Sequence, residues 1–317
     1  FSEYVKTHDK NKNIVLCRDH GGPWQNDHEK NSKLGFDEAM ESAKKSFTVD
    51  IKSDFQIIHI DPTIDIHSKI STEQIFERIF DLYEYCNTTS KKLNKKIAFE
   101  ISLGKEDGGF DKYEEIKQIV SKMENFCRTG DFPLPYFLVI RTGNHVMELK
   151  NVGSFESTFL NTNQDSSKTN LLKIIELCNK HEIRIKEHNT DYLSDRALQL
   201  HPEIGIHAAN IAPEFAVAET RALLSLLKKH QLERELEKFI EISYSSRKWQ
   251  KWMLNDSKLG KQEKAIISGH YIFGKNEFVD LKNDVERKIS LNGTLDSYLK
   301  LEVKKSIIRY LNLFSMI

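Results

Sequence analysis

Short apolar stretches alternate along this chain with longer stretches of helical periodicity, and this alternation limits the possible folds more than any other feature. Six apolar stretches are expected to be strands, at residues 13–20, 55–61, 96–103, 136–143, 182–188 and 204–211. Between them, apolar residues recur every three or four positions, which predicts helices at 35–47, 71–93, 112–126 and 168–182. Strands that alternate with helices predict an α/β fold built around a parallel sheet.

The expected strands are nearly continuous apolar runs, which is typical of a parallel sheet covered on both faces. We therefore expect a TIM-type (β/α)8 barrel over residues 1–225. Six units are visible where a barrel has eight, and the chain begins at Phe1 rather than Met, so we expect the first units to precede this residue. Residues 226–317 are expected to form a helical extension packed on the barrel, and helices are predicted at 211–230, 232–243, 284–289 and 294–314.

Charge and cysteine usage exclude several classes of protein. The 47 basic and 47 acidic side chains cancel and are spread along the chain, so we expect neither a nucleic acid nor a membrane surface as a partner. The four cysteines are far apart, without the paired spacing of a zinc knuckle or a redox motif. Because no apolar run approaches the roughly 18 residues of a membrane-spanning helix and no signal-peptide pattern is present, we expect a cytoplasmic protein.

Acidic and imidazole side chains stand where the expected strands end. They are Asp19 and His20, His59 and Asp61, Glu100, His145, Glu187 and His188, and His207 with Asn210. In a barrel these positions meet at one mouth. Three imidazoles around an open coordination position suit zinc, which polarises a carbonyl, and a neighbouring carboxylic acid can move a proton.

Four stretches carry a resemblance to a known family: "LCRDHGGPW", "IIHIDPTID", "IKEHNTDYLS" and "GIHAANIAPEFAVAETRALL". The sequence up to about residue 225 resembles the non-catalytic subunit family of tagatose-bisphosphate aldolase, also described as tagatose 6-phosphate kinases. That family is similar to the wider class II, zinc-dependent fructose-bisphosphate aldolases, which are TIM barrels. No nucleotide-binding loop supports a kinase, because "GKEDGG" lacks both the glycine spacing and the Lys-Ser/Thr ending.

The resemblance assigns roles to particular residues. It implies that Asp19 and Glu100 transfer protons and that Asn210 contacts the substrate. It places Glu106 and Asp107 on the loop after the Glu100 strand. The zinc ligands that it implies are His20, His145 and His188. These motifs occur along this chain in the same order as in the aldolases.

Two departures from the aldolase pattern bear on the substrate. Asn189, Thr190 and Asp191 replace the Gly-Gly-Ser that supplies backbone donors to a substrate phosphate, and an aspartate there repels phosphate. Ser102 replaces the second acid of the Glu100 strand. We therefore expect Asn189 to face the substrate. The cations Arg18, Arg141 and Lys186 are expected to hold a sugar carboxylate or hydroxyls.

Structural interpretations compete with the functional ones. An isolated Asp19-His20 pair can be purely structural, and His145 can be a surface residue. His59 alternates with isoleucines and is equally well explained as a hydrogen-bonded core residue. Asp61 is expected to orient a ligand imidazole. His207 can be a fourth ligand or a substrate contact.

A buried, ionised Glu100 is costly unless it is paired or bound to metal, which makes it a candidate for function. The leading hypothesis is a zinc-dependent carbon–carbon lyase or epimerase that acts on a ketose, ketose phosphate or sugar acid through a metal-stabilised enediolate. The alternative is a non-catalytic accessory subunit that stabilises a tagatose-bisphosphate aldolase in a hetero-oligomer. A homo-oligomer and a metal-dependent sugar-binding protein without turnover also remain open.

Overall fold

The computed structural model of the chain describes residues 1–104, 109–161 and 165–314. Contacts divide the chain into two compact units. The first comprises Phe1–Thr142, Gln164–Glu187 and Gly205–Ala208. The second comprises Gly143–Asn163, His188–Ile204 and Ala209–Ile317. The division at residue 225 between a barrel and an extension stays a prediction.

The first unit contains the main sheet except for Ala209 of the last strand, and the strand order is β1-β2-β3-β4-β7-β8. The strands are β1 (Cys17–Gly21), β2 (Ile57–Ile60), β3 (Ala98–Ile101), β4 (Phe137–Ile140), β7 (Arg184–Glu187) and β8 (Ala208–Ala209). Neighbours from β1 to β7 pair in parallel. The α/β class and all six expected strands are confirmed, and the sheet is consistent with a TIM-type fold.

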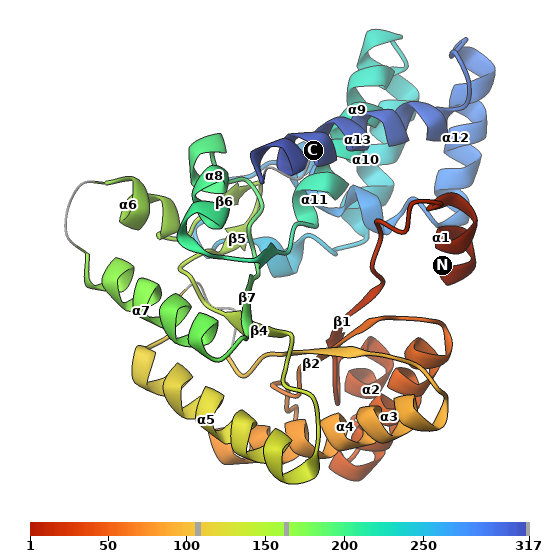
Figure 1. The fold of residues 1–317 in the computed structure, drawn as a ribbon. Coiled ribbons are helices and arrows are strands. Elements are labelled where there is room, and N and C mark those ends of the chain that lie inside the picture. Colours follow the sequence, from red (N-terminus) through yellow and green to blue (C-terminus); the bar gives the residue numbers. More distant parts are fainter. Residues whose placement is uncertain (105–108, 162–164, 315–317) are drawn as a thin grey trace. The chain divides into compact units, whose positions relative to one another are not determined.

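The first unit also contains six helices among its described residues. They are α1 (Ser2–His8), α2 (Asp27–Asn31), α3 (Phe36–Lys52), α4 (Thr72–Lys92), α5 (Tyr113–Gly130) and α7 (Ser166–Lys180). Figure 1 shows α3, α4 and α5 along the same side of the strands. Tyr83 of α4 stacks on Phe99 of β3 with ring centroids 3.7 Å apart, and both side chains are fully buried. The four helices predicted between the strands are confirmed as α3, α4, α5 and α7.

The second unit begins with a hairpin that the sequence did not reveal, β5 (Val146–Met147) and β6 (Lys150–Asn151). The rest is helical: α6 (Phe155–Leu160), α8 (Asp195–Ile204), α9 (Pro213–Lys229), α10 (Glu233–Ser245), η1 (Gln250–Trp252), α11 (Lys261–Ser268), η2 (Gly269–Tyr271), α12 (Asn276–Lys288) and α13 (Leu295–Leu313). The helices predicted from residue 211 onward are confirmed. Among the described residues, none of the helices is both long enough and apolar enough to cross a membrane.

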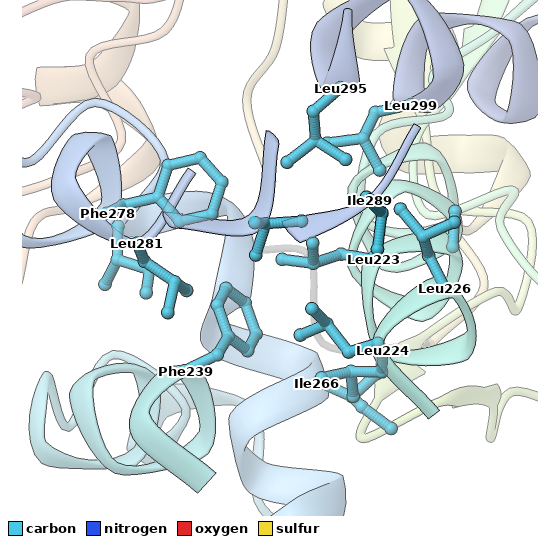
Figure 2. Close-up of a cluster of buried hydrophobic side chains, with 14 of the residues drawn as sticks. Leu223, Leu224, Leu226, Phe239, Ile266, Phe278, Leu281, Ile289, Leu295 and Leu299 are labelled. Atoms are coloured by element: carbon cyan, nitrogen blue, oxygen red, sulfur yellow. The ribbon is translucent and has the colours of Figure 1, made fainter. Parts of the chain in front are cut away.

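The helices of the second unit enclose a core of their own, shown in Figure 2. Its members include Leu223 and Leu227 of α9, Phe239 of α10, Leu281 of α12 and Leu299 of α13. All of them are at most 2% exposed. We call this group the apolar cluster. With Ile266 of α11, its side chains come from five helices, so their burial stabilises the arrangement of those helices with one another.

Candidate functional site

The end of β1 has an unusual backbone. The register with β2 shifts between Arg18 and Gly21, and His20 has a positive φ of 44°. A Cβ atom at Gly21 would lie 2.1 Å from the Phe47 ring, and one at Gly22 would lie 2.3 Å from the carbonyl oxygen of Asp61. The two glycines therefore let the strand end approach its neighbours closely. A non-glycine residue with positive φ is costly, so His20 is held in place by its surroundings.

Asp61, which follows β2, orients the His20 ring. Its Oδ2 lies 2.7 Å from Nδ1 of His20, and it also accepts hydrogen bonds from Thr63 and Gln25. Burial opposes ionisation of Asp61, but the hydrogen bonds from His20 and Thr63 outweigh it and lower the pKa of Asp61 to about 2. With Nδ1 committed to this carboxylate, His20 presents Nε2, 4.0 Å from Oδ1 of Asp19. A carboxylate that fixes an imidazole in this way is typical of metal-binding histidines.

His59 lies at the centre of the group and is fully buried. Its Nδ1 is 3.1 Å from the backbone nitrogen of His20, and its Nε2 is 3.0 Å from Oγ of Ser102. The same Nδ1 is 3.6 Å from Oδ1 of Asp19 and 3.4 Å from Oε1 of Glu100. The hydrogen-bonded core histidine of the structural interpretation is therefore present, and it also lies between two candidate catalytic acids.

Glu100 of β3 and Lys186 of β7 form a buried ion pair. The Lys186 ammonium lies 2.8 Å from each carboxylate oxygen, and the Glu100 side chain is 1% exposed. The Sγ atom of Cys17 is 3.8 Å from the same carboxylate, and burial, reinforced by this negative charge, raises the pKa of Cys17 to about 12. The charge of Glu100 is thus compensated, as a buried carboxylate requires.

These side chains could hold a metal ion. One ligand atom from each of Asp19, His59 and Glu100 lies within 4.8 Å of the others, and the same holds for His20, His59 and Asp61. We call these five residues the acid–imidazole cluster; all of them belong to the first unit. Carboxylate and imidazole donors fit a divalent ion, and the geometry does not identify the metal.

A cavity of about 560 Å³ lies beside this cluster. Its lining consists of His20, Gln25, Asp61, Thr63, Ile64, Asp65, Ser68, Lys69, Ile70 and Gly104. The volume falls within the range of about 300–1,000 Å³ that is usual for small-molecule sites. Amide, hydroxyl and charged groups in this lining can hydrogen-bond a polar ligand. Gln25, Thr63 and Lys69 were not singled out from the sequence, because loop residues of these types carry no pattern.

The second unit holds the predicted site residues His145, His188, Asn189 and Asn210. Nδ2 of Asn151 donates to the carbonyl oxygen of Asn189 at 2.9 Å, and its Oδ1 accepts from the backbone nitrogen of His145 at 3.3 Å. The carbonyl oxygen of Asn210 accepts from the nitrogen of Thr190. Asn151 therefore joins the loops of His145 and Asn189, a role that the sequence did not suggest. Nδ1 of His145 is buried and has no hydrogen-bond partner among the described residues, which leaves it able to bind a ligand.

Asp191 caps helix α9. Its Oδ1 accepts hydrogen bonds from the backbone nitrogens of Ala212 and Glu214, at 3.0 and 2.8 Å. Burial outweighs these bonds and raises the pKa of Asp191 to about 6. A carboxylate thus occupies amides at a helix N-terminus, where an anion such as phosphate would otherwise bind.

The other predicted site residues have the following places. Arg18 pairs with Asp50 at 2.8 Å, and Arg141 pairs with Asp111 at 2.6 Å. Nδ1 of His207 is 3.2 Å from the backbone nitrogen of Ile185 and so contacts β7. Glu106 and Asp107 lie outside the described residues, and His188 directly follows β7 at the start of a segment of the second unit. The roles of Arg141, Lys186, Asn189 and Asn210 in substrate binding, and of His20, His145 and His188 as zinc ligands, stay predictions.

Known structures share this fold. A probable tagatose 6 phosphate kinase from Sinorhizobium meliloti 1021 matches with a TM-score of 0.76 at 14% identity, over 98% of this chain and 85% of that chain. The glycerol complex of the fructuronate-tagaturonate epimerase UxaE from Cohnella laeviribosi matches with a TM-score of 0.57 at 8% identity, over 99% and 70%. No protein-family model and no curated protein sequence matches the chain significantly. At these identities the likeness establishes the fold alone.

Proposed function

We propose that this protein is a zinc-dependent carbon–carbon lyase or epimerase acting on a ketose, ketose phosphate or sugar acid. The observation that carries the proposal is the acid–imidazole cluster at the ends of parallel strands. Support comes from the fold shared with a sugar epimerase and a probable sugar-phosphate kinase. Buried acids and imidazoles are expensive to keep in a protein interior, which favours a site over a scaffold.

His20 is the first proposed ligand, because Asp61 fixes the orientation of its ring through Nδ1. His145 and His188 keep the ligand roles that the resemblance implies. The unpartnered Nδ1 of His145 in the described chain is consistent with such a role. Zinc bound by these imidazoles would supply a positive charge that polarises the substrate carbonyl.

Asp19 is the proposed proton carrier. Its side chain is 55% exposed and lies 4.0 Å from Nε2 of His20, so it can reach a substrate beside that ring. In the retro-aldol direction, Asp19 accepts the proton of a substrate hydroxyl group. The carbon that carries this hydroxyl is one of the two carbons whose bond breaks. The oxygen of that hydroxyl forms the carbonyl of an aldehyde, and the electron pair of the broken bond passes to the carbon next to the ketone, which leaves an enediolate as the second fragment. Epimerisation follows when the same bond re-forms on the other face of the aldehyde.

Glu100 is the second proposed proton-transfer group. Lys186 fixes both of its oxygens, and His59 lies 3.4 Å from one of them. Such fixed positions reduce the reorganisation that proton transfer requires. Asn210 and Asn189 are proposed to position the substrate. The capping of α9 by Asp191 favours a substrate without a phosphate at that helix.

The test compares wild type with Asp19→Asn, both loaded with zinc. Tagaturonate and tagatose serve as substrates, and nuclear magnetic resonance follows cleavage and epimerisation. We expect turnover in wild type, and loss of turnover with retained sugar binding in Asp19→Asn. Equal turnover in the two proteins would contradict the mechanism. A metal-free protein that instead raises the activity of a separate aldolase would show that the accessory-subunit alternative is correct.

A further inference from the structure

The cavity beside His20 contains a positive charge that no acid of the described chain neutralises. Lys69 lines this cavity, and its ammonium makes no ion pair and no hydrogen bond within residues 1–104, 109–161 and 165–314. Lys69 belongs to the loop that begins at Asp61. It therefore lies on the same connection between β2 and α4 as the carboxylate that orients His20.

The other cations considered for the substrate are already engaged by acids. Arg18 pairs with Asp50 at 2.8 Å, Arg141 with Asp111 at 2.6 Å, and Lys186 with Glu100 at 2.8 Å. Each of these would have to give up a partially or fully buried partner before it could bind a substrate anion. Leaving a buried carboxylate unpaired is costly, so these exchanges are unfavourable.

The acids that line the cavity do not cancel the charge of Lys69. Asp65 pairs with Arg78 at 2.6 Å, and both side chains are nearly fully buried. Asp61 accepts hydrogen bonds from His20, Thr63 and Gln25. Because both carboxylates are held by other partners, Lys69 remains available to an anion that enters the cavity.

The loop that carries Lys69 is fixed in advance. Oδ1 of Asp65 accepts from the backbone nitrogens of His67 and Ser68, each at 2.8 Å. The His67 ring contacts the carbonyl oxygen of Leu34 at 2.9 Å. The backbone just before Lys69 is therefore anchored at two points, and the His67 side chain adds a third. A group presented by a fixed loop loses less entropy when it binds a ligand.

We propose that Lys69 is an anion-binding subsite that holds the negatively charged end of the substrate, a carboxylate or a phosphate. This inference rests on the proposed function, since it places the reacting carbons of the same molecule at His20. A lysine ammonium binds either anion as a point charge. Discrimination between a carboxylate and a phosphate therefore depends on the shape of the anion. Lys69 then determines specificity for charged over uncharged sugars.

The test uses three sugars with one carbon skeleton: tagatose, tagatose 6-phosphate and tagaturonate. Their affinities for the zinc-loaded full chain are measured by isothermal titration calorimetry. The variants are Lys69→Met, Lys69→Arg and, as a matched control, Lys117→Met on the exposed side of α5. We expect wild type, Lys69→Arg and Lys117→Met to prefer one or both charged sugars over tagatose. Lys69→Met should lose roughly tenfold in affinity for the preferred charged sugar, with the affinity for tagatose unchanged.

Each outcome decides between the two proposals. If the preference for charged sugars survives in Lys69→Met, the subsite is wrong and the proposed function stands. If Lys69→Met weakens tagatose as much as the charged sugars, Lys69 acts on the cavity as a whole and the subsite is again wrong. If none of the sugars binds the zinc-loaded wild type, both the subsite and the proposed function fail. The anion that loses more affinity in Lys69→Met identifies the end group.

Discussion

The acid–imidazole cluster of the first unit and the apolar cluster of the second each contain fully buried side chains, and these side chains are chemically opposite. His59 and Glu100 are 0% exposed, as are Leu223 and Phe239. The apolar side chains are stabilised by leaving water, whatever their direction. The polar ones lose hydration and are held only by directed partners such as Lys186 and Asp61. Burial alone therefore does not distinguish a hydrophobic core from a functional site, whereas the free-energy cost of burying the groups does.

Within the acid–imidazole cluster, breaking the ion pair of Glu100 and Lys186 should have the largest effect on stability. Lys186→Met leaves the Glu100 carboxylate buried without its cation, and we expect a loss of about 3–5 kcal/mol in the free energy of unfolding. Urea denaturation measures it. Adding Glu100→Gln should restore most of the loss, because no uncompensated charge then remains. A double variant as unstable as Lys186→Met would show that packing, rather than charge, dominates there.

A truncation in the apolar cluster should lower the stability of the protein by a similar amount. No second substitution can restore this loss, because no charge is left uncompensated. Phe239→Ala removes a fully buried ring that lies near the rings of Phe273 and Phe278. We expect a loss of about 3–5 kcal/mol in the free energy of unfolding. Leu301→Ala, at a side chain that is 53% exposed, is the control and should change stability by less than about 0.5 kcal/mol. Similar losses in both variants would mean that the cluster is not the core of this unit.

Asp191 adds a dependence on pH. Its pKa is about 6 in the folded protein, against an ordinary value of 3.8, so the folded state binds the proton more tightly. Stability should therefore fall as the pH rises from about 4 to about 6, by up to about 3 kcal/mol. Asp191→Asn keeps an oxygen to cap α9 and should remove this fall. Denaturation curves at pH 4 and pH 7 test it, and an identical fall in the variant would assign the effect to another group.

The smallest expected effect concerns the orientation of His20. Asp61→Asn weakens the hold on the ring, and we expect zinc affinity to fall about 10- to 100-fold. Competition with a chromophoric chelator measures the affinity. Asp65→Asn is the control, because Asp65 lies on the same loop but pairs with Arg78. If both variants lose zinc affinity equally, Asp61 supports the loop as a whole and does not act specifically on the His20 ring.

The sequence predicted the parts of the molecule that follow from periodicity. Apolar runs placed all six strands, and three- and four-residue spacing placed the helices, because these patterns report which faces are buried. The expectation that Glu100 needs a partner was sound, since a carboxylate in an apolar run is costly wherever the chain folds. The pairing of Glu100 with Lys186 could not be predicted, because it joins β3 to β7 across 86 residues of sequence.

Short-range geometry was also hidden from the sequence. The hairpin of β5 and β6 is too short to produce an alternating pattern. Asp191 was expected to repel phosphate, but its capping of α9 depends on a helix that begins 22 residues later. Lys69 carries no motif, and its place in the cavity depends on the hydrogen bonds of Asp65 and His67. Such contacts arise from tertiary structure and leave no local signal.

The central claim is that the acid–imidazole cluster binds a divalent ion through His20. Equilibrium dialysis against zinc, followed by mass-spectrometric metal analysis, tests it in wild type and His20→Ala. The account predicts stoichiometric zinc in wild type and its loss in His20→Ala with the fold intact by circular dichroism. Wild type without zinc, or a folded His20→Ala that keeps its full content, would contradict it.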